Sequence, residues 1–387
     1  MNKIRVAFFA EVLVRDFDGA TRTMFQIIDR IDTNKFEFLF FCGVAPEGDF
    51  DHEVFHMPSL TIPFNKTYKM ASMVGMGPKI TQKLESFSPD VIHISSPSPL
   101  GYFALKYGRE HKVPVISIYH AHFMSHIKYY TNNVPVITQV LEHFFTAHAK
   151  SFYDRCNMVY LPTEQFVEEL GGHGFKSSHM KVWRRGIDLN LFNPEKKNKE
   201  YIANLVRNDN KNILFVGRLV WEKNLECLMN MYDLVRERGL KYNFIIAGDG
   251  VARSQLEKRM PLAYFLKHTK QTVLAKIYAS SDFFVFPSAT ETYSNAIAEA
   301  MACGVPCLVA DKGGAKGFVK QGVNGFLCDP DNPSDYLKMM EILSNQPGLV
   351  NSITNQAFLD VMMFRWDQLV SQYFDDITQL TMSEVVG

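Results

Sequence analysis

Two short polar segments carry residue types that could bind a diphosphate and a sugar. In the first, Gly217 and Arg218 directly follow the apolar run 212–216, and Lys223 stands five residues after Arg218, where a helical pattern begins. An arginine can fork across phosphate oxygens, a lysine adds a point charge, and a helix N-terminus adds amide donors. This segment predicts a diphosphate site; the alternative is a pair of solvated surface cations.

The second segment contains two carboxylates separated by seven residues. Glu291 follows the apolar run 282–286, and Glu299 falls within the helical pattern 295–302. A carboxylate in a loop after a strand can accept hydrogen bonds from sugar hydroxyls. Ser294 is the candidate N-cap, so a phosphate or sugar would face the exposed amides of Ser294, Asn295, Ala296 and Ile297. The alternative is a loop charge at Glu291 and a helix-dipole partner at Glu299.

The elements that must position these residues are short apolar runs alternating with helical stretches, a pattern typical of a parallel sheet covered on both faces. The runs are 4–10, 36–42, 91–95, 113–119, 158–161, 212–216, 243–247, 282–286 and 305–310. The stretch 193–212, rich in Lys, Asn and Glu, is predicted to be a linker. We therefore expect two doubly wound domains, whose carboxyl edges would face a cleft for two substrates.

The composition excludes several classes of protein. Among 387 residues, 41 Lys and Arg balance 41 Asp and Glu, which argues against a nucleic-acid partner. The apolar run at the N-terminus ends at Glu11, too early for a signal peptide, and no apolar stretch is long enough to span a membrane. The six cysteines are dispersed and are expected to be buried thiols in a reducing cytosol. These features predict a cytoplasmic protein.

Taken together, the motifs resemble those of the family 4 glycosyltransferases, which have the GT-B architecture. The resemblance implies that Arg218 and Lys223 bind the donor diphosphate, that Glu291 contacts the donor sugar, and that Glu299 contacts the ribose. The segments 248–250 and 299–306 also look like the family's. The segment 18–23, which includes Gly19 and Ala20, looks like the glycine loop that approaches the donor phosphates.

The first half of the chain resembles the glycolipid-forming branch of that family, such as sulfoquinovosyl-diacylglycerol synthases and phosphatidylinositol mannosyltransferases. The resemblance implies that His120 projects toward the transferred sugar, whereas His93 is expected to be a structural residue in a strand. Ala121 stands where the branch commonly has threonine, and Lys267-His268 stand where a glycine is usual. Since the latter pair lies near the expected nucleotide base, the identity of the base stays open between UDP and GDP. We expect a UDP-sugar as the favoured donor.

The resemblance implies a GT-B, α/β fold with two tandem Rossmann-like domains. We expect an acceptor-binding domain at 1–193, a nucleotide-sugar domain at 194–364, and a C-terminal helix at 365–387 that returns to the first domain. The implied activity is retaining transfer of a hexose to a hydroxyl, with a diacylglycerol or ceramide head group favoured. His120, Glu291, Arg218 and Lys223 would be catalytic. No cofactor or metal is expected, since no carboxylate or cysteine lies close in sequence to His120, His122 and His126.

Two windows without acidic residues predict a membrane-facing surface on the first domain. The window 54–84 contains four lysines, and 111–141 contains two, both with methionines or aromatic residues nearby. Such a mixture suits an anionic lipid interface, and the alternative is an ordinary solvated surface. We expect the protein to lie peripherally at the inner face of the cell membrane.

Three other functions remain open at this point. A glycosyltransferase of polysaccharide or cell-envelope glycan assembly would share every donor motif. A sugar-nucleotide 2-epimerase shares the two-domain architecture. A regulatory protein that binds a nucleotide sugar without turnover is the third.

Overall fold

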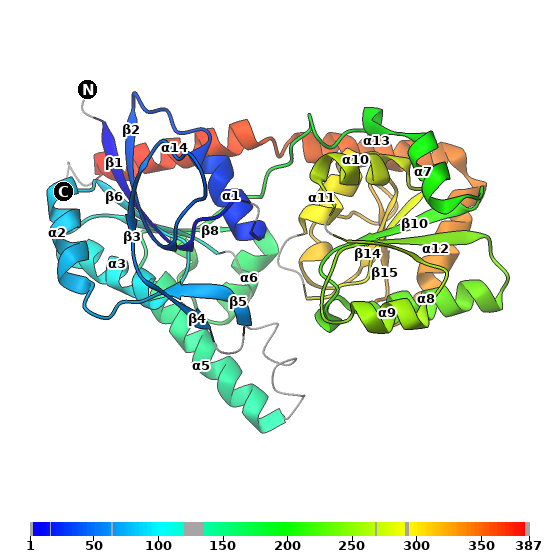
Figure 1. Ribbon diagram of the computed structural model, residues 1–387, viewed down its shortest axis with the longest axis horizontal. Helices are drawn as coiled ribbons and strands as arrows, with labels where there is room; N and C mark the ends of the chain where they lie inside the picture. The colour runs from blue at the N-terminus through cyan, green and yellow to red at the C-terminus, as the bar shows by residue number, and fades with distance from the viewer. Residues whose placement is uncertain are drawn as a thin grey trace. The chain divides into compact units, whose positions relative to one another are not determined.

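The computed structural model describes residues 3–15, 17–62, 65–119, 135–267, 269–290 and 294–383. The chain forms two compact units, Met1–Arg184 with Asp367–Gly387, and Arg185–Trp366 (Figure 1). The first boundary therefore comes nine residues before the expected one at 193/194. The reason is that Ile187 and Phe192 are buried in the core of the second unit, where the Phe192 ring packs against Tyr278.

The first unit is built on a seven-stranded parallel sheet in the order β3-β2-β1-β6-β7-β8-β9. The strands are β1 Ile4–Val12, β2 Phe36–Val44, β3 Glu53–His56, β6 Val91–Ile94, β7 Val115–Ile118, β8 Met158–Leu161 and β9 Met180–Val182. A separate antiparallel hairpin pairs β4 (Ser59–Ile62) with β5 (Asn65–Ala71). The chain winds outward from β1 in one direction to β3 and then in the other from β6, which is the doubly wound topology expected from the sequence.

Helices cover both faces of this sheet (Figure 1). They are α1 Gly19–Ile28, α2 Gly77–Phe87, α3 Pro99–Glu110, α5 Pro135–Tyr153 and α6 Glu164–Gly172. The central strands are mostly apolar because both of their faces are buried. Every residue of β6 and β7 is buried, including the polar His93 and Ser117.

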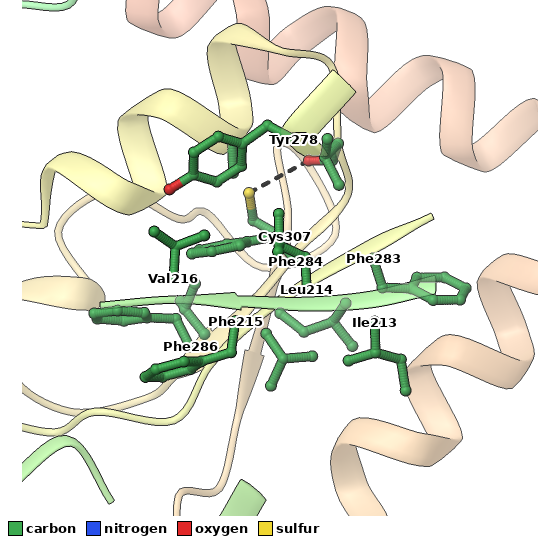
Figure 2. Close-up of a cluster of buried hydrophobic side chains, with 14 of the residues drawn as sticks. Ile213, Leu214, Phe215, Val216, Tyr278, Phe283, Phe284, Phe286 and Cys307 are labelled. Carbon is green, nitrogen blue, oxygen red and sulfur yellow. Dashed lines mark hydrogen bonds between the residues drawn. The ribbon is translucent and has the colours of Figure 1, made fainter. Parts of the chain in front are cut away.

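The second unit repeats the topology with six parallel strands in the order β12-β11-β10-β13-β14-β15. The strands are β10 Lys211–Val216, β11 Tyr242–Ala247, β12 Tyr264–Leu266, β13 Phe283–Phe286, β14 Cys307–Ala310 and β15 Phe326–Cys328. The main helices are α7 Lys199–Val206, α8 Leu225–Glu237, α9 Arg253–Arg259, α10 Gln271–Ser280, α11 Asn295–Ala302, α12 Pro333–Asn345 and α13 Pro347–Met362. Figure 2 shows apolar side chains of β10 and β13 packed together in the core of this unit.

The predicted linker at 193–212 is wrong. It contains a short 3-10 turn, Pro194–Lys196, and then helix α7, which begins at the N-cap Asn198 and belongs to the second unit. Ile202 and Val206, four residues apart on one face of α7, are buried in the core. Tyr201 and Leu205 pack against the same core. The polar composition of the rest of the stretch reflects its exposed face and hides this short apolar stripe.

The C-terminal helix α14, Trp366–Ser383, returns to the first unit as predicted. Its Tyr373 hydroxyl lies 2.8 Å from His93 Nδ1, and the indole of Trp183 donates to the Leu369 carbonyl. Its buried Asp376 accepts hydrogen bonds from Tyr160 and from the Lys181 ammonium. His93 is thus a structural residue, as expected. Among the helices described, none combines the length and the apolar character needed to cross a membrane.

Candidate functional site

The second unit brings its two polar segments to one edge of its sheet. Strands β10 and β13 are parallel neighbours, with Ile213 opposite Phe283 and Leu214 opposite Phe284. The sheet reverses its winding between these two strands, and ligands of doubly wound proteins bind outside the carboxyl ends of the strands at such a point. The segments that follow β10 and β13 are about 70 residues apart in sequence, and this pairing makes them neighbours.

Two cations follow β10 in different environments. The Arg218 guanidinium is largely exposed and lies 3.1 Å from the Glu222 carboxylate. Lys223 is half-buried at the end of a 3-10 turn, with its ammonium 6.0 Å from the Phe286 ring centroid. Burial and the Arg218 charge lower the Lys223 pKa, Glu222 opposes both, and the net value is about 8. A bound anion would relieve both causes of the shift, so the arrangement suits a diphosphate.

Asn224 joins the loops of this edge. It has a left-handed backbone (φ 54°) at the start of α8, and its amide group donates to the carbonyls of Pro287 (3.2 Å) and Pro330 (2.8 Å). The Thr290 hydroxyl donates to the Glu222 carbonyl at 2.9 Å. The loops after β10, β13 and β15 are therefore held together by side-chain bonds. Nothing in the local sequence indicates this role of Asn224, since both acceptors lie more than 60 residues away.

The segment 248–250 closes the same edge through backbone contact. Gly248 has a φ of 151°, and a Cβ atom there would lie 1.9 Å from the Gly217 carbonyl oxygen. A Cβ at Gly250 would lie 2.4 Å from the Leu219 carbonyl oxygen. The Leu219 amide in turn donates to the Asp249 carbonyl. These glycines permit the loops after β10 and β11 to touch.

Helix α11 begins at the predicted N-cap. The Ser294 hydroxyl accepts from the Ile297 amide at 3.4 Å, so the amides of Asn295 and Ala296 lie in the first turn at this edge. Glu299 lies further along α11 and is only 7% exposed. It accepts a hydrogen bond from the Tyr278 hydroxyl at 3.0 Å. Its contact with a ribose stays a prediction.

The remaining predicted residues fall into two groups. His120 and Glu291 lie outside the described residues. Gly19 and Ala20 form the first turn of α1 in the first unit, where Asp18 and Thr21 cap the helix reciprocally. Gly19 and Ala20 were expected in a loop. That expectation is wrong, because the capping box of Asp18 and Thr21 starts the helix at Gly19.

The acid-free windows are described in part. Lys69 and Lys79 are exposed, and Val74 is 87% exposed, whereas Lys83 forms an ion pair with Glu53 of the neighbouring strand β3. Residues 120–134 of the second window lie outside the described residues. The first window therefore presents exposed cations beside an exposed apolar side chain.

Comparison with known proteins identifies the family. A family model described as "Glycosyltransferase Family 4" matches residues 17–191, and one described as "Glycosyl transferases group 1" matches residues 210–346. A GDP-mannose-dependent alpha-mannosyltransferase of Corynebacterium glutamicum is 30% identical over 339 residues, covering 85% of this chain and 78% of that protein. The chain belongs to glycosyltransferase family 4.

Other members of this glycosyltransferase family are similar at lower identity. A sulfoquinovosyl transferase of Arabidopsis thaliana is 28% identical over 77% of this chain and 58% of its own length. An alpha-monoglucosyldiacylglycerol synthase of Acholeplasma laidlawii is 20% identical over 92% of each chain. Among solved structures, a sucrose-phosphate synthase of Thermosynechococcus elongatus superposes with a TM-score of 0.78 at 16% identity, covering 98% of this chain and all of that one. The GT-B fold expected from the sequence is confirmed.

Proposed function

We propose that this glycosyltransferase moves a hexose from a nucleotide-diphosphate sugar to the hydroxyl of a lipid head group, with retention of the anomeric configuration. The observation that carries the proposal is the half-buried Lys223 beside Arg218 at the carboxyl edge of β10, with the Lys223 pKa lowered to about 8. Two cations at the winding reversal of a doubly wound sheet favour a diphosphate as the ligand.

In this proposal Arg218 and Lys223 bind the two phosphates and stabilise the negative charge that develops on the leaving diphosphate. The first-turn amides of α11 supply further donors. The leaving phosphate oxygen takes the proton of the acceptor hydroxyl as the new glycosidic bond forms on the same face of the sugar. His120 and Glu291 contact the transferred sugar, and Glu299 contacts the ribose. The two cations neutralise the leaving group, so the proposed reaction requires no cofactor or metal.

The donor is proposed only as a class. The name of the Corynebacterium glutamicum relative favours GDP-mannose. A similar structure, Anabaena HepE, was solved with UDP-glucose, and it has a TM-score of 0.73 at 17% identity, covering 97% of this chain and all of that one. The sequence favoured UDP, so both bases belong in the test.

The acceptor is proposed from the relatives and from the first unit. The name of the Acholeplasma laidlawii relative includes a glycosyldiacylglycerol product. The exposed Lys69, Lys79 and Val74 support peripheral contact between the first unit and an anionic bilayer, at about 1 kcal/mol per cation.

The test is incubation of the protein with UDP- and GDP-hexoses and a total lipid extract, followed by mass identification of the products. We expect a hexosylated lipid, and Arg218→Ala should lower its rate of formation by about 100-fold, as for loss of a transition-state charge partner. Activity close to wild type in that variant would contradict the diphosphate site. Transfer only to a soluble glycan would favour glycan assembly, epimerised donor would favour the 2-epimerase, and donor binding without turnover would favour a regulatory protein.

A further inference from the structure

The first unit has a winding reversal of its own, and a buried carboxylate lies beside it. Strand β1 pairs with β2 on one side and β6 on the other, so the sheet reverses between β1 and β6. The Ser95 amide, just after β6, donates to the Phe9 carbonyl near the end of β1. Glu11 is the next-to-last residue of β1 and is only 8% exposed. It therefore lies at the edge where doubly wound domains bind ligands.

The two oxygens of Glu11 differ in their contacts. Oε2 accepts a hydrogen bond from the amide of Ala71, the last residue of β5. Oε1 is fully buried and has no hydrogen-bond partner among the described residues. Leaving a buried carboxylate oxygen without a partner costs about 1–3 kcal/mol or more, so few native proteins retain one without a use.

The surroundings hold the carboxylate in place but do not neutralise it. A Cβ atom at Gly43 would lie 2.8 Å from the backbone of Ala71, so the glycine is what lets Ala71 approach the sheet. Burial raises the Glu11 pKa. A side-chain interaction with the Ser98 hydroxyl and the hydrogen bond from the Ala71 amide oppose this rise without outweighing it. No cation is among the groups that shift this pKa. Nearby, burial and the Glu11 charge raise the pKa of the Cys42 thiol to about 12.

We propose that Oε1 of Glu11 accepts a hydrogen bond from a hydroxyl of the acceptor, the molecule that receives the sugar. This bond positions the acceptor for the transfer. This inference rests on the proposed function, which assigns the donor diphosphate to the second unit and leaves the acceptor to the first. A carboxylate binds a hydroxyl donor but repels a phosphate, so the acceptor presents an uncharged polyol to this edge. Glu11 acts as a positioning residue and takes no part in bond breaking.

The test replaces Glu11 with glutamine and measures acceptor and donor kinetics separately. Because the Ala71 amide needs an oxygen, the Glu11→Gln side chain turns its amide nitrogen toward the acceptor and loses the acceptor lone pair. The acceptor is short-chain ceramide in mixed micelles, because ceramide has a second hydroxyl that can donate to Glu11 while the first receives the sugar. We expect kcat/KM for ceramide to fall about 10- to 100-fold, the range for a hydrogen bond to a charged group. The donor Kd and the rate of donor hydrolysis without lipid should stay within about twofold of wild type.

The matched control is Glu37→Gln, which changes an exposed carboxylate of β2 in the same unit and should leave lipid kinetics unchanged. Phosphatidylinositol in place of ceramide should be used poorly by wild type and relatively better by Glu11→Gln. If glutamine prevents folding, Glu11→Asp retains the charge but withdraws it from the acceptor, and the same loss in lipid kcat/KM is expected.

Two results would overturn the assignment while leaving the proposed function intact. One is wild-type lipid kinetics in a folded Glu11→Gln protein. The other is a parallel loss of donor affinity, which would mean that Glu11 only supports the fold. If wild type transfers hexose to no lipid, the proposed function itself is wrong and the Glu11 assignment fails with it.

Discussion

The pKa of Lys223 leads to a quantitative prediction for nucleotide binding. The Lys223 ammonium is half-buried and lies beside Arg218. Burial and the Arg218 charge bring its pKa to about 8, a pH at which binding can be measured. Only the protonated form attracts a diphosphate. A terminal phosphate has its second pKa near 6, so the diphosphate of the nucleotide is fully charged above about pH 7.5. Above that pH the nucleotide therefore adds no pH dependence of its own to the affinity.

The magnitude follows from the protonated fraction of Lys223. About nine-tenths of the lysine is charged one pH unit below its pKa, half at the pKa, and about one-tenth one unit above it. If the charged form alone binds tightly, affinity for UDP or GDP falls about tenfold between pH 7 and pH 9. Bound nucleotide favours the charged form, so its pKa rises in the complex and binding above pH 8 takes up a proton.

The assay is isothermal titration calorimetry with UDP and with GDP at several pH values, in buffers of different ionisation enthalpy to count protons. Lys223→Arg is the matched variant, because its guanidinium stays charged and should give a nearly flat profile. Glu222→Gln removes the group that raises the Lys223 pKa and should move the decline to lower pH. A flat wild-type profile, or the same decline in Lys223→Arg, would refute the reasoning.

Two further predictions concern stability. Burial lowers the pKa of His93 from its ordinary value of 6.5 to about 3, so below pH 6.5 the unfolded chain gains a proton that the native chain does not. The free energy of unfolding should therefore fall by about 1.4 kcal/mol per pH unit between pH 6 and pH 4, as measured by denaturant titration, and His93→Gln should remove this contribution. Gly248→Ala should lower both the melting temperature and the affinity for nucleotide, because the added Cβ would overlap the Gly217 carbonyl oxygen. The control is Gly171→Ala on α6, where the added Cβ meets open space and the melting temperature should not change. Equal melting temperatures for the two variants would contradict the close approach at Gly248.

Local sequence patterns predicted much of the fold. Buried parallel strands are continuous apolar runs, and β8 was placed within its observed bounds, as was helix α11. The short strands β9, β12 and β15 were missed, because three residues are too few to show a period. Helix α7 was read as a linker because its apolar residues form a single short stripe within a stretch of polar composition.

The candidate site divides in a similar way. The Ser294 N-cap was found from sequence and is confirmed, because helix capping depends on residues a few positions apart. The diphosphate site at Arg218 and Lys223 was also predicted from a local motif, and it stays a prediction. The sequence also determined the family, through motifs that lie within single loops.

Only the tertiary structure decided which loops meet. The pairing of β10 with β13 and of β1 with β6 depends on long-range packing, and so do the Asn224 bonds to Pro287 and Pro330. The state of each charge was decided there too. The sequence marks Lys223 as a candidate cation and does not single out Glu11, but in neither case does it show burial, which is the largest cause of their pKa shifts in the fold.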